Sequence, residues 1–395
     1  MQRAPASAIR KSFDVVIVGG GPAGSVTALA VAGRGRSVLQ VERCPEFGWV
    51  QRCAEGVLRS QLHLYVEPQP EFIRAEIHAA RFYAPNGTFA DIQRPNSGYI
   101  LNRPAFDREL AGRAAAAGVE QWTSSYPQKI GVTKSGVELE ILRDGVLESV
   151  GCEIIVGADG VDSRVAQWTG LASTLAPGQI GCCYQETIRH DSINPERIGF
   201  FVGKDVAPGG YAWVFPRGGN EANAGVVIGG NFNRSRMAKA YFESWIGKYY
   251  SKAIRSTPMC GGIPGFSKGQ PIAGERVLLV GDAARQVNPL AASGILEALR
   301  AGRIAGEVIA EACRHGDFSA RYLQRYQKEW QNSLGNKHQK YWRIKQAIDR
   351  LDDDTYNQAT AALCKLDPAQ TSVTDVFRAL LFRKPGLILL LRHLF

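Results

Sequence analysis

The sequence lacks the paired cysteine spacing that a structural zinc site needs. Its 395 residues include eight cysteines, and none of them forms a CxxC motif. The cysteines are also too sparse for the disulfide framework of a small secreted domain. We therefore expect no metal site, a reducing cytoplasmic environment and mostly buried thiols.

The sequence also lacks a long uninterrupted hydrophobic run. Residues 15–33 carry no charge, but five of them are glycine and one is proline. A membrane-spanning helix needs about 20 consecutive apolar residues and no such punctuation, whereas a strand, a tight turn and a helix do need it. We therefore expect neither a targeting segment nor a transmembrane segment here.

Positive charge is present in excess. Lysine and arginine number 47 against 37 aspartates and glutamates, which gives a formal net charge of +10. This balance is compatible with phosphates, acidic lipids or nucleic acid as partners, and charge alone does not choose among them. The hydrophobic fraction of 45% excludes a disordered chain, and the length predicts two or three structural units.

A strand, a glycine-rich turn and a helix follow one another near the N-terminus. Residues 13–18 form a β-branched run, residues 19–24 carry the spacing GxGxxG, and residues 26–32 are typical of a helix. A second strand, residues 37–41, ends at Glu42, 18 residues after the last of these glycines. A carboxylate at this place can accept hydrogen bonds from an adenosine ribose. The pattern predicts a βαβ unit that binds a dinucleotide.

Each glycine of the motif has a separate physical role. Gly19 permits the tight turn, Gly21 lets a pyrophosphate approach the backbone at the helix N-terminus, and Gly24 lets the helix pack closely on the strand.

Two later segments again place an acid at the end of a strand. Residues 152–157 lead into Asp159, and residues 276–280 lead into Asp282. Asp282 can bind ribityl hydroxyls, and the N-terminus of the helix after Gly294 can face the negative side of a reduced flavin ring. Asp159 has a simpler interpretation as well, an Asp-Gly turn that closes a strand.

The motifs GxGxxG, DG and GD, in this order, resemble the three fingerprints of the FAD-dependent oxidoreductases that include para-hydroxybenzoate hydroxylase. The resemblance implies FAD as the cofactor. No second GxGxxG occurs, so we predict no separate nicotinamide domain. We expect electrons from transiently bound NADPH or from a protein donor such as a reduced ferredoxin.

Strand-like runs joined by hairpin signals lie between the flavin segments. Turn residues at 85–87 and at 144–145 separate such runs, and residues 173–270 continue in the same manner. The sequence predicts an α/β fold: a Rossmann-type FAD-binding domain, an inserted antiparallel β-sheet that roofs the flavin and holds substrate, and a C-terminal helical region. The predicted boundaries are 12–60, 98–172 and 271–318 for the discontinuous FAD-binding domain, 61–97 and 173–270 for the sheet domain, and 319–395 for the helical region.

Residues 211–216 bring three aromatic side chains to one face of a strand. Tyr211, Trp213 and Phe215 occupy alternate positions, and alternate side chains of a strand point the same way. Core packing is one interpretation. An aromatic wall beside the flavin, in contact with substrate, is the other.

Further segments are similar to the geranylgeranyl reductase family, flavoenzymes that saturate prenyl double bonds in chlorophyll precursors, archaeal lipids or quinones. The segments are RCAEG at 52–56, NRPAFDREL at 102–110, and the aromatic strand together with NAGV at 223–226. The resemblance covers nearly the whole chain, and CAEG looks most like the archaeal lipid branch, the digeranylgeranylglycerophospholipid reductases. It implies FAD contacts from Ala23, Glu42, Cys53, Ala54, Gly56, Arg103, Asp282, Gly294 and Ile295.

The chain departs from this resemblance at residues 290–293, with the sequence LAAS. The family resemblance implies more glycine there. We therefore expect the loop over the flavin to be less open, and the substrate to be the first property that differs.

Reduction of an isolated prenyl double bond needs a proton as well as a hydride, because such an alkene is not electron-poor. Cys53, Glu55 and Tyr211 are candidate proton donors by their chemistry, and the sequence does not rank them. If protonation leads, the ring faces of Tyr211, Trp213 and Phe215 each stabilise the positive charge by about 0.5–2 kcal/mol. Two alternatives stay open: an aromatic monooxygenase or halogenase on the same FAD fold, and a non-catalytic flavin or lipid carrier.

The composition changes after residue 320. Residues 321–350 are rich in Lys, Arg, Gln, Tyr and Trp, and helices with solvated faces are favoured over nucleic-acid binding. The leucine run at 387–391 is too short to span a bilayer, and a helix there either docks on the core or lies on an acidic lipid surface at the cytoplasmic face of the membrane. The expected partners are a prenylated lipid or isoprenoid substrate and a membrane surface, without nucleic acid. Cations flank the leucine run: Arg378, Arg383, Lys384 and Arg392.

Overall fold

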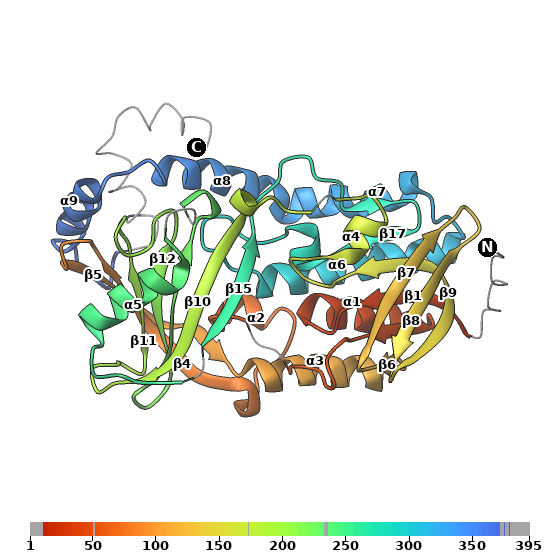
Figure 1. The fold of residues 1–395 in the computed structure, drawn as a ribbon, viewed down its shortest axis with the longest axis horizontal. Coiled ribbons are helices and arrows are strands. Elements are labelled where there is room, and N and C mark those ends of the chain that lie inside the picture. The colour runs from red at the N-terminus through yellow and green to blue at the C-terminus, as the bar shows by residue number, and fades with distance from the viewer. Residues whose placement is uncertain are drawn as a thin grey trace.

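Two β-sheets organise the part of the chain that the structure describes. This computed structural model describes residues 11–49, 52–172, 174–232, 236–256 and 258–371, together with 375 and 379. An eight-stranded sheet lies at one end of the long axis and a nine-stranded sheet at the other (Figure 1).

The eight-stranded sheet has a parallel centre in the order β17-β9-β1-β2-β6. The last four residues of β1 are fully enclosed, as expected of a β-branched strand covered on both faces. β16 pairs antiparallel with β17 at one edge, and the β7–β8 hairpin pairs antiparallel with β9. The bounds are β1 (Lys11–Val18), β2 (Val38–Val41), β6 (Glu120–Trp122), β7 (Ser125–Val132), β8 (Val137–Arg143), β9 (Val146–Gly157), β16 (Ala273–Gly274) and β17 (Val277–Leu279).

Small residues bring the helices of this unit close together. α1 (Pro22–Ala32) packs against α3 (Arg103–Ala116) and α6 (Ile295–His315). A Cβ at Gly306 would lie 2.4 Å from the Cβ of Ala30, so α6 can approach α1 this closely only because a glycine faces it. The short α4 (Arg164–Trp168) follows β9.

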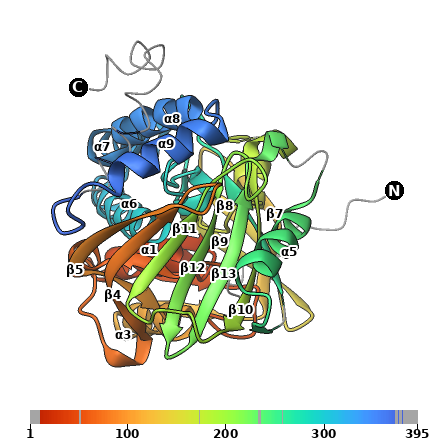
Figure 2. The same cartoon turned by 90° about the vertical axis from the view of Figure 1, so that its left-hand side faces the viewer.

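The nine-stranded sheet has the order β14-β10-β13-β12-β11-β4-β5-β3, with β15 paired to β10. Its pairs are antiparallel except β4 with β11, which run parallel. α5 (Ala238–Tyr249) covers the outer face of this sheet (Figure 2). The bounds are β3 (Gly56–Leu58), β4 (Ile73–Tyr83), β5 (Phe89–Leu101), β10 (Ile180–Arg189), β11 (Arg197–Phe201), β12 (Tyr211–Gly218), β13 (Glu221–Ile228), β14 (Ile254–Arg255) and β15 (Met259–Pro264).

The C-terminal helices pass from one sheet to the other. α7 (Ala320–Trp330) packs beside β16 and β17. A π-helical turn, Gln331–Gly335, then leads without a break into α8 (Asn336–Ile348). α9 (Asp353–Leu363) follows and packs with the end of α8 on the β4–β5 hairpin, through the apolar cluster of Ala90, Ile92, Ala347, Leu351, Ala359 and Leu363. Figure 2 shows α8 and α9 together along one side of the nine-stranded sheet.

The predicted α/β fold class is confirmed, with its FAD-type sheet, second sheet and helical C-terminal region. One expectation about the hairpins was wrong. The turn at 144–145 joins β8 to β9, and both belong to the eight-stranded sheet rather than to the roof. β3 and β5 also belong to the nine-stranded sheet, although β3 lies within residues 12–60 of the predicted FAD-binding domain and β5 crosses the predicted boundary at 97/98. The leucine run and its flanking cations lie outside the described residues.

Candidate active site

The glycine-rich turn has the geometry of a phosphate-binding loop. Gly19 has a φ of +119°, and a Cβ there would lie 2.2 Å from the carbonyl oxygen of Ala158. A Cβ at Gly24 would lie 2.0 Å from the carbonyl oxygen of Gly19, so no side chain fits at either position. A Cβ at Gly21 would meet no atom within 4 Å. The loop therefore packs tightly against the protein at Gly19 and Gly24 and is open at Gly21, as a pyrophosphate at the N-terminus of α1 requires.

Glu42 lies at the end of β2 and closes this loop from the other side. Its Oε2 accepts a hydrogen bond from the backbone N–H of Gly20 at 2.7 Å, and its Oε1 accepts one from the N–H of Cys44 at 2.8 Å. These two bonds fix the carboxylate. The position fits the ribose contact that the sequence predicts.

The GD turn, Gly281–Ala284, lies between α1 and the start of α6. A Cβ at Gly281 would lie 2.8 Å from the Cβ of Ala23, and one at Gly294 would lie 3.4 Å from Oδ1 of Asp282. Burial raises the pKa of Asp282 to about 6, while the positive charge of Arg103 opposes the shift. Three predicted cofactor residues, Ala23, Asp282 and Gly294, are thus adjacent in space.

Arg103 at the first turn of α3 is held in place by Asp107. Its Nε and Nη2 each donate to one carboxylate oxygen of Asp107, both at 2.9 Å. This bidentate pair is buried, with side-chain exposures of 13% and 5%. The charge of Arg103 also opposes the rise in the pKa of the Cys53 thiol that burial causes, so Arg103 links the GD turn to the CAEG segment.

The CAEG segment is anchored to the nine-stranded sheet through its backbone. The carbonyl oxygen of Cys53 accepts hydrogen bonds from Gln185 Nε2 at 3.2 Å and from Asn223 Nδ2 at 3.0 Å. A Cβ at Gly56 would lie 3.0 Å from the ring of Phe215. Cys53, Ala54 and Gly56 line a large cavity from this anchored position.

Glu55 borders the cavity and is held in a buried ion pair. It has a φ of +72°, only 1% of its side chain is exposed, and its Oε2 lies 3.0 Å from Arg217 Nη1. Burial raises the pKa of Glu55 to about 6, and the nearby cations, first among them Arg217, limit that rise. A positive φ is uncommon for a non-glycine residue, and the ion pair is the contact that compensates here.

Asp159 holds its own loop together. Its Oδ1 accepts from Ser163 Oγ at 2.5 Å, and its Oδ2 accepts from the backbone N–H groups of Arg164 at 2.8 Å and Val165 at 3.1 Å. Ser163 in turn accepts from the N–H of Ala166 as the N-cap of α4. This agrees with the simpler interpretation of the Asp-Gly turn, and an FAD contact from Asp159 stays a prediction.

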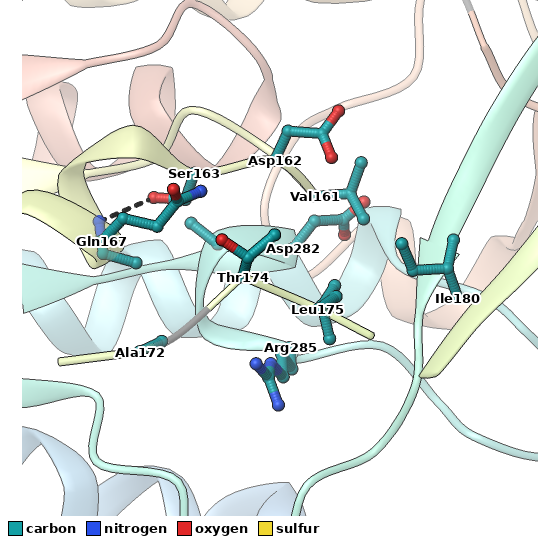
Figure 3. A pocket seen from close by; sticks show the side chains of 12 residues that line it. Val161, Asp162, Ser163, Gln167, Ala172, Thr174, Leu175, Ile180, Asp282 and Arg285 are labelled. Carbon is teal, nitrogen blue, oxygen red and sulfur yellow. Dashed lines mark hydrogen bonds between the residues drawn. The ribbon is translucent and has the colours of Figure 1, made fainter. Parts of the chain in front are cut away.

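A small pocket joins the DG loop to the GD turn (Figure 3). Its volume is about 110 Å³, and its wall includes Asp162 and Ser163 from the first segment and Asp282 and Arg285 from the second. The two acidic fingerprints, more than 100 residues apart in the chain, therefore lie around one space.

The large cavity occupies about 1720 Å³ between the nine-stranded sheet, the start of α6, and helices α8 and α9. Small-molecule sites usually enclose about 300–1,000 Å³, so this space is large even for a site that also receives a flavin ring. Predicted residues in its wall are Cys53, Ala54, Glu55, Gly56, Tyr211, Phe215, Gly294 and Ile295.

The aromatic strand contributes two of its three rings to this cavity. Tyr211 and Phe215 line it, and both rings pack edge-on against Phe200 at 5.4 Å between centroids. Trp213 is 4% exposed, and its Nε1 donates to Asn223 Oδ1 at 3.0 Å. Its ring lies against Gly225, where a Cβ would be 2.3 Å away. Trp213 therefore packs in the sheet behind the wall, and its predicted substrate contact is the least supported of the three.

Two polar residues near the start of α6 were not predicted from the sequence. Ser293 and Glu297 both line the cavity, and Ser293 Oγ donates to Glu297 Oε1 at 3.1 Å. Ala292, between Pro289 and Gly294, has a φ of +54°, a conformation that favours glycine. The unusual LAAS stretch was the signal in the sequence, because it departs from the glycine-rich pattern at the place where these side chains meet.

Comparisons with known proteins agree with this geometry. Residues 14–70 match the family model described as FAD binding domain, and residues 179–262 match the geranylgeranyl reductase catalytic domain. The chain is 34% identical over 386 residues to a digeranylgeranylglycerophospholipid reductase of Methanothrix thermoacetophila, covering 96% of this chain and 99% of that protein. It is 36% identical over 396 residues to a second one from Methanopyrus kandleri, covering 97% and 99%.

A solved structure shows the same fold over the whole length. The geranylgeranyl bacteriochlorophyll reductase-like protein of Thermoplasma acidophilum is 30% identical, has a TM-score of 0.92, and the match covers 98% of this chain and 100% of that one. A flavin-dependent halogenase with a TM-score of 0.69 is 17% identical, which shows the fold alone.

The glycine-rich loop, Glu42 and the GD turn, together with the large cavity, define an FAD-dependent oxidoreductase. The residues present fit the cofactor, since Glu42 is hydrogen-bonded to the glycine-rich loop at Gly20, the loop is open at Gly21, and the GD turn lies next to Ala23 at the start of α1. The chain belongs to the digeranylgeranylglycerophospholipid reductase family, and it is an FAD-dependent reductase of carbon–carbon double bonds.

Two further observations concern metal and membrane. Within the described residues, no three His, Cys, Asp or Glu side chains gather in a way that could hold a metal ion. Over the same part of the chain, no helix combines the length and the apolar character needed to cross a bilayer.

Proposed function

We propose that this protein reduces the double bonds of geranylgeranyl chains carried by a glycerophospholipid. The observation that carries the proposal is the large apolar cavity that begins at Gly294 and the CAEG segment, where the flavin ring is expected, and extends to α8 and α9. The names of the relatives support the same class of substrate.

The walls of the cavity suit a long hydrocarbon chain. They carry few polar side chains relative to their extent, and the apolar ones come from both the sheet and the C-terminal helices. Burying such a chain stabilises the complex by roughly 0.8 kcal/mol per CH₂ group, without any need for directional contacts. Apolar residues of the wall include Ile77, Phe82, Ile92, Ile198, Phe200, Val227, Ile263, Phe266, Ile344, Ile348, Leu351 and Leu363.

The phosphate of such a lipid would find cations along one side of the cavity. Lys337 and Lys340, on α8, line the cavity and are exposed to solvent. Arg300 of α6 also lines it and donates to Ser333 Oγ at 3.0 Å. These side chains favour a phosphate-bearing lipid over an uncharged quinone.

FAD, when bound and reduced, supplies the hydride. The protein's own contribution is to hold the alkene against the ring, to exclude water and to provide the proton. Tyr211 and Phe215 present aromatic faces to the cavity next to Gly56, and such faces stabilise positive charge on a tertiary carbon by about 0.5–2 kcal/mol each.

The electron donor and the membrane contact complete the proposal. We expect NADPH or a reduced ferredoxin as the donor, because the sequence has one dinucleotide motif. We expect peripheral binding to an anionic membrane, since the substrate is a lipid and the chain carries a net charge of +10. Co-sedimentation with anionic vesicles should weaken at high salt and after removal of the residues beyond Arg383. Equal sedimentation of the full and truncated chains would count against this membrane contact.

The reaction is tested with purified FAD-loaded protein, reduced without oxygen and mixed with digeranylgeranylglyceryl phosphate in detergent micelles. Reoxidation of the flavin should depend on the lipid, and mass spectrometry should find two added hydrogens for each reduced bond. Geranylgeranyl diphosphate and a prenyl quinone serve as comparison substrates. Flavin that reoxidises only with oxygen, and leaves the lipid unchanged, would contradict the proposal.

A further inference from the structure

Glu297 is a buried acid that faces the cavity. It is not one of the three proton donors predicted from the sequence. It lies three residues after Gly294, the N-cap of α6, and is 8% exposed. Its Oε1 accepts the hydroxyl hydrogen of Ser293 at 3.1 Å, and its Oε2 has no hydrogen-bond partner among the described residues. An ionised carboxylate with an unpaired buried oxygen is costly, so this environment favours the protonated acid.

The groups around Glu297 have opposite effects on its pKa. Burial is the largest influence and raises its pKa to about 7, and the negative charge of Asp282, from the GD turn, adds to the rise. A hydrogen bond from the backbone of Glu297, the hydrogen bond from Ser293 and the positive charge of Arg300, one helical turn further along α6, oppose the rise. Arg300 is directed to Ser333 of the π-helical turn by a 3.0 Å hydrogen bond, so it does not form an ion pair with Glu297.

The three predicted donors are less available. The hydroxyl of Tyr211 donates to the carbonyl oxygen of Ala291 at 2.8 Å, and burial raises the pKa of this phenol. Burial also raises the pKa of the Cys53 thiol. Glu55 is 1% exposed and paired with Arg217. A general acid is most effective when its pKa lies near the working pH, and Glu297 lines the cavity together with the hydroxyl of Ser293, to which it is hydrogen-bonded.

We propose that Glu297 is the proton source for the reduction and that Ser293 is the group that delivers the proton to the alkene. The inference rests on the proposed function. When Glu297 is protonated, the hydrogen bond between the two side chains runs the other way: the acid O–H donates to Ser293 Oγ, and the hydroxyl hydrogen of Ser293 is directed to the alkene. Glu297 then gives its proton to Ser293 Oγ while the hydroxyl proton of Ser293 forms the new C–H bond at one alkene carbon. The hydride of reduced FAD forms the C–H bond at the other carbon. The alkene gains two electrons, the flavin loses two, and the carboxylate of Glu297 is reprotonated from water after turnover.

The arrangement is a feature of this chain's LAAS stretch. Ser293 follows Ala292, whose φ of +54° turns the chain into α6, and Ser293 is partly exposed whereas Glu297 is buried. Both side chains line the cavity, and Ser293 is the more exposed of the two.

The experiment follows lipid-dependent flavin reoxidation in single turnovers, without oxygen, across a pH series, with digeranylgeranylglyceryl phosphate in micelles as the probe. For the wild type, the rate constant should fall as the pH rises through about 7, because Glu297 loses its proton. Glu297→Gln should lower it about 100-fold at pH 7 and remove this pH dependence. Ser293→Ala should slow the step strongly, and Ser293→Thr should restore most of the rate because it keeps a hydroxyl.

A direct readout of the proton accompanies the kinetics. Infrared spectra of the FAD-loaded protein without lipid should show a carboxylic acid component that disappears as the pH rises through about 7. Glu297→Gln should lack this component and keep those of Asp282 and Glu55, whose pKa values are raised only to about 6. Glu307→Gln, an exposed position on the same helix paired with Arg34, is the matched control and should keep both the component of Glu297 and the pH profile. Each variant is first checked for bound FAD.

The experiment distinguishes a failure of the proposed function from a failure of this inference. If the wild type does not reoxidise with the lipid, the proposed function fails and the inference with it. If the wild type reoxidises but Glu297→Gln keeps its rate and pH profile, the proposed function stands and the inference is wrong. A Ser293→Ala variant with the wild-type rate would remove Ser293 from the path.

Discussion

The cofactor end of the molecule and the cavity end achieve their purposes in opposite ways. At the cofactor end, backbone atoms approach so closely that a Cβ at Gly24 would lie 2.0 Å from a carbonyl oxygen. At the cavity end, apolar side chains surround about 1720 Å³ of space. The cofactor end depends on glycines at positions where no side chain fits. The cavity end depends on the combined size and apolar character of many side chains, so that one apolar residue can substitute for another. We therefore expect a single substitution at the cofactor end to abolish FAD binding, and a single substitution at the cavity end to lower the rate of flavin reoxidation only in part.

The largest effect is expected from two glycines of one loop. Gly24→Val places three carbon atoms where the carbonyl of Gly19 lies, and we expect a loss of at least about 3 kcal/mol in the free energy of unfolding and no bound FAD. Gly21→Ala meets no protein atom within 4 Å, so it should unfold like the wild type yet bind FAD more weakly. Thermal unfolding and flavin fluorescence measure the two properties. Equal stability losses in both variants would erase the distinction between a packing glycine and a cofactor glycine.

The next largest effect is expected from a comparison of two aromatic residues of β12, one in the sheet and one in the cavity wall. Trp213→Ala should lower the free energy of unfolding by about 3–5 kcal/mol, because its ring is enclosed in the sheet and hydrogen-bonded to Asn223. Phe215→Leu should cost less than about 1.5 kcal/mol and slow lipid-dependent flavin reoxidation, since Phe215 lines the cavity. Denaturant unfolding and single-turnover kinetics separate the two roles. A Trp213→Ala variant of normal stability that cannot reduce lipid would place Trp213 in the substrate site instead.

A third effect depends on pH. The pKa of Glu297 is raised from 4.5 to about 7 in the folded chain, so the folded state holds this proton more tightly than the unfolded state. Its contribution to stability is therefore complete below about pH 4.5 and is lost as the pH rises through about 7. Glu297→Gln should be more stable than the wild type at pH 8, by up to about 3 kcal/mol, and close to it at pH 4. Melting temperatures of the FAD-free proteins at both values test this. A wild-type advantage at pH 8 would contradict the shift.

The smallest effect compares the two acidic fingerprints. Asp159→Asn should lower the free energy of unfolding by about 1 kcal/mol, because its carboxylate fixes the loop before α4, and should change FAD affinity little. Asp282→Ala should weaken FAD retention during dialysis and leave the loop intact. The absorbance of retained flavin gives the answer. Full retention by Asp282→Ala would refute the assigned ribityl contact.

The sequence was sufficient for the parts of the site that depend on local geometry. The β1–α1–β2 unit, Glu42 and the GD turn could be predicted because glycine and acidic residues at fixed spacing have few structural solutions. The bounds of the first helix were short by four residues, since α1 begins at Pro22 rather than at Val26. This difference is a turn of helix at the phosphate site.

Parts that depend on distant segments could not be predicted. A hairpin turn at 144–145 does not say which sheet its strands join, and β8 and β9 join the eight-stranded one. Burial of Glu297 depends on the packing of α6 against α1 and the GD turn, which no local pattern encodes. The pairing of Glu55 with Arg217 likewise joins two segments 162 residues apart.

The π-helical turn Gln331–Gly335 sets the rotational phase between the two halves of one long helix. An α-helix turns by about 100° per residue, and a π-helical turn amounts to one inserted residue. Before it, Leu323, Tyr326 and Trp330 are buried on the side of α7 that meets the eight-stranded sheet. After it, Lys337, Tyr341 and Ile344 line the large cavity. Deleting one residue within the turn would rotate the cavity face of α8 by about 100° and leave the packing of α7 unchanged. A single insertion or deletion in this turn would thus exchange the side chains that α8 presents to the cavity without any substitution in the cavity wall itself.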